Sequence, residues 1–487
     1  MTPDAIVVGS GPNGLAGAVT LARAGLSVEV LERSDYVGGG ASTRELTIPN
    51  VDNDVCSAVH PMALASEFFS RFDLASRVEM LTPEISYAQP LDRQPAAIAY
   101  LDIARTAKEL GVDGDKWLRL LRPLAKPGAG LGNVIGHELL RIPEHPITTA
   151  RLGMRALVHG TPLWNLPFST TRAAALLTGV FAHTIQSLPS IGTAAAGLAL
   201  AAYGHSVGWP IPRGGSGSIS AALVADLQAH GGVVRTGVDV KRLTDIPRAR
   251  IILLDVTPRG FLRMAGDLLP TQFRRSMSRF RYGNGVAKAD FVLSEPVPWA
   301  DRRLRSAVTV HVGGTRQEMA RAERAVARGS HAEHPYVLTC QPTVLDETRA
   351  PEGMHVLWAY THVPSGSTQD QLQTIIGQIE RFAPGFRDTI VATASRTAAD
   401  MQRQNPNDVG GDIAAGDVST FQLIARPRVA SNEWSTPLRG VYLCSASTAP
   451  GPGVHGQCGW NAALRALRDE FGFTHSPSLA PDPKARG

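Results

Sequence analysis

The N-terminal segment carries the most regular pattern of hydrophobic and polar positions in the chain. Residues 5–8 form a short β-branched run, which is typical of a buried parallel strand. Residues 15–24 have the alanine-rich faces of a helix, and Gly25 ends it. A second strand is expected over residues 27–31, so that a βαβ unit closes at Glu32.

The rest of the chain alternates between helical and strand patterns. Residues from about 100 to 205 follow a helical pattern rich in Ala and Leu that prolines interrupt. Two segments, at about 286–294 and 353–363, alternate apolar and polar residues as half-buried strands do. Further helices are expected at 218–230, 320–327, 372–382 and 460–467, and further strands at 233–240 and 441–444.

The composition indicates a folded chain with more than one domain. It has 487 residues, of which 43% are hydrophobic and 19% are charged. The net charge is +5, and no run of Lys and Arg is dense enough for a nucleic-acid surface, so no nucleic-acid partner is expected. The basic cluster at residues 274–281 is interpreted as a solvated helix face, although contact with an anionic lipid or substrate stays open.

The four cysteines exclude two further classes of protein. None of them forms a C-x-x-C pair, and their spacing suits neither a zinc site nor a disulfide framework, so no metal is expected. The chain shows no signal-peptide pattern, and its longest small-apolar run, residues 192–203, is too short to span a bilayer. We therefore expect a cytoplasmic protein, and a peripheral membrane contact stays open.

Residues 9–14 carry the first motif with a chemical meaning, G-x-G-x-x-G. The motif follows a strand, opens a helix and precedes an acidic residue, Glu32, at the usual distance. Gly9 permits a tight turn, Gly11 lets the backbone approach a pyrophosphate, and Gly14 lets the helix pack on the sheet. The helix N-terminus then faces the phosphates, and Glu32 is placed to bind ribose hydroxyls.

A second glycine loop, Gly38-Gly39-Gly40, favours FAD over NAD as the dinucleotide. It comes soon after Glu32 and is followed by Ala41 and Ser42. A loop there suits an extended dinucleotide whose phosphates and ribityl chain run back across the sheet. A simple nicotinamide-binding fold does not need such a loop, so the predicted cofactor is FAD.

Together these motifs resemble those of the phytoene desaturase-like branch of FAD-dependent oxidoreductases. This branch includes carotenoid desaturases and isomerases and the pyridine nucleotide-disulfide oxidoreductase domain-containing proteins. The stretches that carry the resemblance are residues 7–42, 54–61, 211–215 and 443–459. It implies that the backbone at Val238 meets the adenine and that residues 443–459 close over the isoalloxazine.

The motifs and the resemblance together predict the cofactor contacts of the chain. Two positions depart from the family pattern: Ala41 stands where many such flavoproteins have arginine, and Pro452 stands where glycine is expected. The predicted FAD-binding residues are Gly9, Gly11, Pro12, Asn13, Gly14, Glu32, Arg33, Gly39, Gly40, Ala41, Val238, Ser447, Gly453, Val454 and His455.

Catalytic side chains are harder to find, because a flavin carries the hydride itself. His60 is a candidate acid or base in the substrate-proximal segment, and a structural histidine before proline is an equal alternative. His455 is the other candidate for an acid or base. The alternative is that this position contributes only its backbone. Asp412 is interpreted as a turn residue, and Trp358, Tyr360 and Trp460 as core residues, with roles in the cavity as the alternative.

The predicted fold class is α/β, with a Rossmann-type FAD-binding domain of the glutathione-reductase-like superfamily. This domain is expected to be discontinuous, over residues 1–92, 206–284 and 406–487, with disorder from about 475 to 487. A mixed sheet with a helical layer, from residues 93–205 and 285–405, would form an interleaved α+β substrate domain. The site would lie where the two domains meet.

The predicted function is that of a dehydrogenase or desaturase. It would remove a hydride from a largely apolar small molecule, with a quinone or oxygen as the final electron acceptor. Three alternatives stay open: a redox-neutral flavin-dependent isomerase, an amine or amino-acid oxidase, and a flavin-binding protein without turnover. A disulfide reductase is excluded by the lack of a redox cysteine pair, and a separate nicotinamide domain by the lack of a second complete G-x-G-x-x-G.

Overall fold

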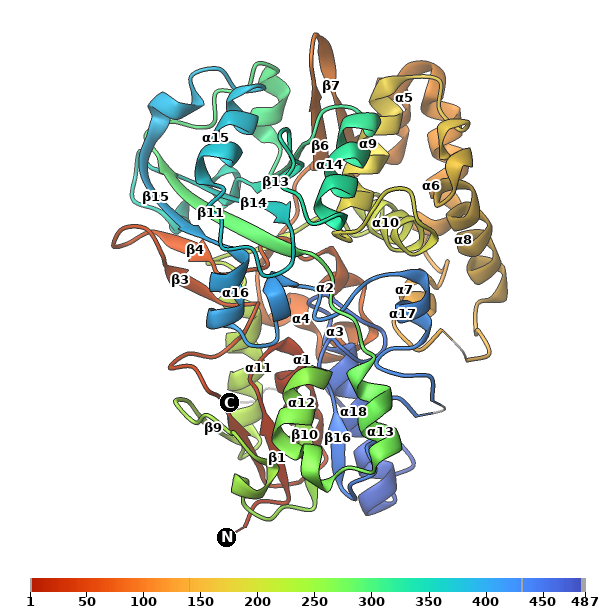
Figure 1. Cartoon of the computed structure of the whole chain (residues 1–487), viewed down its shortest axis with the longest axis vertical. Helices are drawn as coiled ribbons and strands as arrows, with labels where there is room; N and C mark the ends of the chain where they lie inside the picture. The colour runs from red at the N-terminus through yellow and green to blue at the C-terminus, as the bar shows by residue number, and fades with distance from the viewer. Residues whose placement is uncertain (1, 140, 431, 483–487) are drawn as a thin grey trace.

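Two sheets and a layer of helices make up the chain. The structure is a computed structural model that describes residues 2–139, 141–430 and 432–482. A parallel sheet with its helices occupies the lower part of Figure 1, and a larger sheet lies above it beside a layer of helices. Segments distant in sequence meet in both sheets, so the chain passes between the two regions more than once.

The smaller sheet has five parallel strands in the order β16-β10-β1-β2-β9. Alternate residues of β1 enter different cores: Ala5 and Val7 pack on one face of the sheet, and Ile6 and Val8 on the other. The strands are β1 (Ala5–Val8), β2 (Val28–Leu31), β9 (Val233–Arg235), β10 (Ile251–Leu254) and β16 (Val441–Leu443). Both faces are covered, as expected for a parallel sheet with continuous apolar strands.

Helices cover both faces of this sheet. The first face carries α1 (Pro12–Arg23), α11 (Gly217–Ala229) and α18 (Gln457–Phe471). The second carries α12 (Pro258–Ala265) and α13 (Thr271–Ser278). Helices α1 and α18 approach so closely that a Cβ on Gly459 would lie 1.7 Å from the carbonyl oxygen of Asn13.

The larger sheet has seven strands in the order β15-β11-β14-β13-β12-β6-β7. All neighbours are antiparallel except β12 and β6. The strands are β6 (Ile85–Leu91), β7 (Gln94–Tyr100), β11 (Gly285–Leu293), β12 (Thr309–Val312), β13 (Val337–Cys340), β14 (His355–Val363) and β15 (Ile390–Arg396). Strands β11 and β14 were expected to be half-buried, and this expectation was wrong: apart from His355 at one end, every residue in them is buried.

Helices cover the two faces of the larger sheet in different ways. Helix α15 (Leu372–Glu380) packs on one face, while α9 (Thr171–Ala182) and α10 (Ile191–Gly204) lie on the side where a cavity separates them from part of the sheet. The outer helices are α5 (Ile103–Leu110), α6 (Gly114–Ala125), α8 (Pro146–His159) and α14 (Arg316–Ala327). The helical pattern predicted for residues 100–205 is confirmed.

Short elements connect these regions. The helices are α2 (Pro61–Ala65), α3 (Glu67–Phe72), α4 (Leu74–Arg77), α7 (Leu131–Ile135), α16 (Ala398–Gln404) and α17 (Thr420–Ile424). The strands are β3 (Thr43–Glu45), β4 (Asp52–Asp54), β5 (Met80–Leu81) and β8 (Ile211–Pro212). The predicted mixed α/β fold with a Rossmann-like domain is confirmed. The domain boundaries stay a prediction, and β6, which lies inside the predicted segment 1–92, pairs in the larger sheet.

The C-terminal segment contacts the rest of the chain around Leu479. Leu479 is only 2% exposed, and the Arg77 guanidinium donates to its carbonyl oxygen. Arg23 donates to the carbonyl of Ser478 and pairs with Asp482. These contacts anchor the segment around Leu479, while most of its other residues are exposed, and the predicted disorder from about 475 stays a prediction whose residues 483–487 lie outside the described residues.

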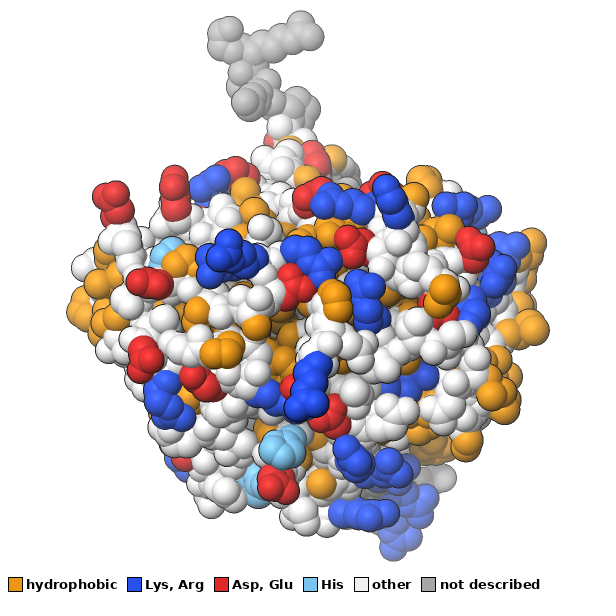
Figure 2. Space-filling model, turned by 90° about the horizontal axis from the view of Figure 1, so that it is seen from above, with side chains coloured by type: hydrophobic (Ala, Val, Ile, Leu, Met, Phe, Trp, Pro, Cys, Tyr) orange, Lys and Arg blue, Asp and Glu red, His pale blue; other side chains and the backbone are white. Residues whose placement is uncertain are grey.

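The surface seen from above carries mixed charge. Figure 2 shows Lys and Arg side chains interspersed with Asp and Glu over this face, with apolar side chains scattered among them. Among the described residues, no helix is both long and apolar enough to cross a membrane.

Candidate functional site

A cavity of about 560 Å³ runs between the two sheets. At one end it is lined by the turn after β1, the end of β2 and the segment after β9. At the other it is lined by the larger sheet, by helix α10 and by the segment that follows α9. The cavity therefore connects the predicted nucleotide site with the interior of the second region, as the sequence predicted for the functional site.

The turn between β1 and α1 is a backbone cradle. Gly9 has φ +99°, and Gly11 is the N-cap of α1 with Pro12 at the first helical position. A Cβ on Gly11 would lie 2.6 Å from Asp255 Oδ2, and one on Gly39 would lie 3.2 Å from the Cα of Gly11. The two glycine loops thus touch backbone to backbone, and side chains there would fill the cradle.

Asp255 lies directly beneath this turn, at the end of β10. Its Oδ2 accepts a hydrogen bond of 3.1 Å from the Gly14 N–H. Burial raises the pKa of its carboxyl to about 7, against the lowering effect of the Gly14 hydrogen bond and with a further increase from Glu32. Sequence reasoning missed this residue because a single aspartate after a strand carries no motif.

The Glu32 carboxylate organises the neighbouring turn. Its Oε2 accepts from the N–H of Ser10 at 2.8 Å and from the Ser10 hydroxyl at 2.7 Å, while Oε1 accepts from the N–H of Ser34 at 2.8 Å. A carboxylate offers about four acceptor positions, so about one remains for a ribose hydroxyl. Arg33 also lines the cavity, and its guanidinium donates to the carbonyl of Gln404.

The segment after β9 brings two valines to the cavity, Val238 and Val240. Val238 lines the cavity, but its N–H donates to the carbonyl of Glu32 at 2.8 Å and is not free for an adenine. Val240 lines the same cavity, and its N–H makes no hydrogen bond to any residue that the structure describes. The adenine contact at the Val238 backbone stays a prediction, and Val240 offers a free N–H donor two residues later.

The closing segment before α18 has both cavity-facing and structural residues. Pro452, Gly453 and Val454 line the cavity. The Ser447 hydroxyl instead donates to the carbonyl of Ala415 at 2.6 Å. His455 is buried and used twice by the backbone, because its Nε2 lies 3.1 Å from the carbonyl oxygen of Gly451 and its Nδ1 accepts from the N–H of Gln457.

Most of the predicted residues meet at this cavity. Gly9, Gly11, Pro12, Asn13, Glu32, Arg33, Gly39, Gly40, Ala41, His60, Val238, Gly453 and Val454 line it. Three others, Gly14, Ser447 and His455, do not. Gly14 serves packing, since a Cβ there would lie 2.2 Å from the carbonyl oxygen of Gly9. The side chains of Ser447 and His455 bond to the backbone around the closing segment.

His60 lines the cavity as a neutral, oriented imidazole. Its Nε2 lies 2.7 Å from the Ser216 hydroxyl, which itself donates to the carbonyl of Ser57. Because the hydroxyl proton of Ser216 already bonds to that carbonyl, the hydroxyl oxygen must accept from His60. His60 Nε2–H is therefore the donor, and Nδ1 carries a lone pair. Burial lowers the pKa of His60 to about 4, and Nδ1 is buried with no partner among the described residues.

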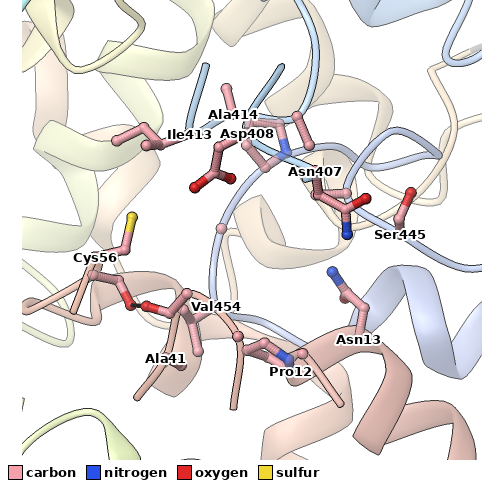
Figure 3. A pocket seen from close by; sticks show the side chains of 18 of the residues that line it. Pro12, Asn13, Ala41, Cys56, Asn407, Asp408, Ile413, Ala414, Ser445 and Val454 are labelled. Carbon is pink, nitrogen blue, oxygen red and sulfur yellow. Dashed lines mark hydrogen bonds between the residues drawn. The ribbon is translucent and has the colours of Figure 1, made fainter. Parts of the chain in front are cut away.

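Asn407 and Asp408, which follow α16, were not predicted to be part of the site. Figure 3 shows Asn407 and Asp408 across the cavity from Pro12, Asn13 and Ala41, with the Asp408 carboxylate directed into the cavity on the same side as the Cys56 thiol. The Asn407 amide donates to the carbonyl of Asp255 at 2.8 Å and so fixes this segment to β10. Burial, and then Asp412, raise the pKa of Asp408 well above its usual range.

Asp412, Trp358, Tyr360 and Trp460 differ in whether they take part in the cavity or in the surrounding structure. Asp412 accepts from the N–H groups of Gly283, Ala414 and Gly416, which is the turn role predicted for it. Trp358 and Tyr360 line the cavity, so the alternative role in the cavity holds for both. Trp460 packs in the core against Phe68, with ring centroids 6.5 Å apart.

One face of the larger sheet forms the roof of the cavity. Strand alternation places Thr309 and His311 of β12 on the same face as Leu338 and Cys340 of β13. The register extends this face to further residues of β14 and β11, namely Trp358, Tyr360, Lys288 and Asp290. Lys288 and Asp290 form a buried ion pair, each side chain 2% exposed. Of the polar residues on this face, Thr309 lines the cavity, and Lys288, Asp290 and His311 are buried without lining it, so these positions are shielded from solvent.

Comparisons with known proteins match both the nucleotide-binding end and the chain as a whole. The family model of the NAD(P)-binding Rossmann-like domain matches residues 7–72. Pyridine nucleotide-disulfide oxidoreductase domain-containing protein 2 of Rattus norvegicus is 25% identical over 96% of this chain and 93% of its own length. The 4,4'-diapolycopen-4-al dehydrogenase of Metabacillus indicus is 32% identical over 25% of each chain.

A solved structure of putrescine oxidase shares the fold, with a TM-score of 0.63 and 16% identity, over 96% of this chain and 99% of that one. Among the described residues, no cluster of His, Cys, Asp and Glu side chains could hold a metal ion. These comparisons confirm the resemblance that the glycine motifs indicated: the chain is similar to the pyridine nucleotide-disulfide oxidoreductase domain-containing proteins along nearly its whole length, and to a 4,4'-diapolycopen-4-al dehydrogenase over a quarter of it.

Proposed function

We propose that this protein is an FAD-dependent oxidoreductase that removes a hydride from a largely apolar organic substrate. The observation that carries the proposal is a single cavity that runs from the glycine cradle to the roof of the larger sheet. A dinucleotide and a second, apolar molecule can share such a space, and pockets of this kind form where two regions of a chain meet.

The residues at the lower end fit FAD. Gly9, Gly11 and the N-terminus of α1 would hold the pyrophosphate, because the cradle presents backbone N–H groups and has no room for a Cβ. Asn13 Oδ1 is a buried acceptor without a partner among the described residues, next to that cradle. Glu32 would bind the ribose, and Val240 the adenine, through its free N–H.

Residues 452–454 and the start of α18 would lie against the flavin ring. When bound, FAD supplies the hydride acceptor. The N-terminus of α18 is a site of partial positive charge, which stabilises negative charge that develops near it. The apolar lining excludes water from the reacting carbon, and His60 contributes a neutral imidazole with an unpaired Nδ1.

We also propose that a quinone or oxygen is the final electron acceptor. The single complete G-x-G-x-x-G motif is used by the predicted dinucleotide site. The four cysteines are free thiols, and burial raises the pKa of the Cys56 thiol to about 12, which disfavours the thiolate that disulfide chemistry requires.

The first test is the absorbance spectrum of the purified protein, before and after incubation with FAD. A bound flavin spectrum is expected, and apolar candidate substrates should bleach it under anaerobic conditions. NADH and NADPH, tested in parallel, should bleach it more slowly than such a substrate. The proposal would be overturned by a protein that carries no flavin and takes up none.

A second candidate, oxidation of amines, is favoured by the fold shared with putrescine oxidase. The Asp408 carboxyl lines the cavity and would be the group that binds the amine. Burial raises its pKa, which disfavours the charged carboxylate that an ammonium group would pair with. Release of hydrogen peroxide with primary amines, absent in an Asp408→Leu variant, would support this candidate. No peroxide with any amine would leave the apolar substrate as the better account.

A further inference from the structure

A pair of histidines lies where the roof meets the helical layer. His183 follows α9 and lines the cavity, and His311 is a fully buried residue of β12. Their Nε2 atoms are 2.9 Å apart, so one ring donates and the other accepts. Which ring donates decides what His183 presents to the cavity.

Gln89 on β6 decides the tautomer of this pair. The Gln89 Nε2 donates to the carbonyl of Gly314 at 2.9 Å, which orients the amide and leaves Oε1 buried without a partner. His311 Nδ1 is buried and unpartnered as well. Both atoms face Gly179, where a Cβ would lie 2.5 Å from Gln89 Oε1 and 2.7 Å from His311 Nδ1.

If His311 Nδ1 carries the proton, it is a donor, and Gln89 Oε1 beside it is an acceptor. A lone pair on Nδ1 would instead set two unpartnered acceptors beside each other in a buried space, which is unfavourable. With Nδ1 protonated, His311 Nε2 is the acceptor and His183 Nε2–H is the donor. The remaining nitrogen of His183, Nδ1, then carries a lone pair and has no partner among the described residues.

Both rings are neutral in this environment. Burial lowers the pKa of His183 to about 3, with a smaller contribution from His362, and burial lowers the pKa of His311 well below its usual range. The rings are also packed among aromatic groups: Trp209 lies 5.1 Å from His183 and Tyr87 lies 5.6 Å from His311, between ring centroids. A neutral imidazole in such surroundings acts as a hydrogen-bond acceptor for a neutral donor.

A second unpartnered polar atom belongs to the same end of the cavity. Thr309 lines the cavity and is 1% exposed, and its hydroxyl is buried without a partner among the described residues. It lies on the same face of β12 as His311, two residues away, or about 6.6 Å along the strand. The other lining groups here, Trp209, Leu338 and Leu200, are mainly apolar.

We propose that this end of the cavity binds a hydroxyl group on an otherwise apolar substrate. The substrate hydroxyl donates to His183 Nδ1 and accepts from the Thr309 hydroxyl. His311 and Gln89 are positioning residues that keep His183 in the required tautomer. The proposal names the substrate class of the cavity and to that extent rests on the proposed function.

The test measures binding of three probes of similar shape: 1-phenylethanol, acetophenone and ethylbenzene. Dissociation constants are obtained from quenching of tryptophan fluorescence, on the protein as purified and after saturation with FAD. The wild type is expected to bind 1-phenylethanol about threefold to tenfold more tightly than either of the other probes, which is the range for one or two net hydrogen bonds. This readout does not require a flavin, so failure of the proposed function would be seen separately in the absorbance spectrum.

Variants assign the preference to the named atoms. His183→Leu should abolish the preference for the alcohol, whereas His183→Gln, which keeps an acceptor, should restore part of it. His355→Leu, at the end of β14 and outside the cavity, is the matched control and should bind like the wild type. Tighter binding of acetophenone than of 1-phenylethanol would mean that His183 presents a donor, and would overturn the proposal. So would equal binding of all three probes, or no binding of any, by the wild type.

Discussion

The two ends of the cavity are built by different means. At the glycine cradle the contacts come mainly from backbone, and the residues that make it, Gly9, Gly11 and Gly39, lie close together in the sequence. At the roof the contacts come from side chains on β12, β13 and β14, in a sheet whose strand order differs from the order of the strands in the chain. The backbone of the first end suits a cofactor that stays the same. The varied side chains of the second end suit the recognition of a particular substrate.

This difference explains why the sequence predicts the cofactor more easily than the substrate. A phosphate-binding turn needs glycine for steric reasons, so its spacing is preserved in the sequence itself. A roof built from alternate strand residues needs only a suitable side chain at each position, and no spacing rule marks it. Four changes would break or sharpen this comparison, from the largest expected effect to the smallest.

The largest effect is expected where the two regions are tied together. Arg349, after β13, donates to Asp54 of β4 at 3.0 Å, and both side chains are at most 2% exposed. Arg349→Met leaves the Asp54 charge buried and is expected to cost about 3–5 kcal/mol in the free energy of unfolding. Urea denaturation followed by tryptophan fluorescence measures it. The control Arg242→Met removes an exposed pair with Asp245 and should leave the midpoint unchanged; equal midpoints for the two variants would contradict the prediction.

The second effect is a pH dependence at the cradle. The pKa of Asp255 is raised in the folded state to about 7, so its carboxyl stays neutral while that of the unfolded chain ionises. Wild-type stability should therefore fall as the pH rises from about 4 to 7, whereas Asp255→Asn should not lose this contribution. At about 1.4 kcal/mol per pH unit, the difference between the two proteins builds to about 4 kcal/mol.

Denaturation midpoints of the flavin-free proteins at several pH values measure this difference. Asp267→Asn changes an exposed carboxylate and provides the control, with a pH profile that matches the wild type. Parallel profiles for the wild type and Asp255→Asn would show that the buried carboxyl does not titrate in this window.

The third effect tests the backbone character of the cradle. Gly11→Ala places a methyl group 2.6 Å from Asp255 Oδ2, and we expect the dissociation constant for FAD to rise at least about tenfold, equivalent to about 1.4 kcal/mol. Gly153→Ala, on the outer helix α8, has nothing within 4 Å of the new methyl and should bind FAD like the wild type. Fluorescence titration with FAD measures both, and equal affinities would refute the role of the turn.

The smallest effect concerns the positioning residue of the roof. Gln89→Leu removes the acceptor that faces His311 Nδ1 and should reduce the preference for 1-phenylethanol over ethylbenzene by about threefold, because the tautomer is no longer fixed. Gln317→Leu, an exposed change on α14, is the control. An unchanged preference in Gln89→Leu would separate Gln89 from the function of His183.

The strands of the roof show how far pattern alone can lead. Alternation in residues 286–294 and 353–363 correctly predicted strands, but the polar positions were assigned to solvent. In the fold, Lys288, Asp290 and His362 are buried at those positions. Periodicity reports that two faces differ, and it does not report whether the polar face meets water or a cavity, because both favour the same residue types.

The candidate site divides in the same way. The cradle residues and His60 were predicted and line the cavity, while Val240, Asp255, Asp408 and His183 were not predicted. The resemblance did not indicate Val240, and only the hydrogen bond from the Val238 N–H to the carbonyl of Glu32 reveals which N–H is free. For His455, a position in a flavin-closing motif did not reveal that the backbone occupies both of its nitrogens.

By itself the sequence determined the βαβ unit, the glycine turn, the acidic residue at the end of β2 and therefore the class of ligand that we propose for the lower end. These depend on local sterics and on hydrogen bonds between residues close in the chain. Only the tertiary structure decided what surrounds the substrate, because the roof brings together Gln89, His183, Thr309 and Trp358 from separate strands and helices. Contacts between such distant residues depend on how the sheet is ordered, and sheet order is a property of the folded chain as a whole.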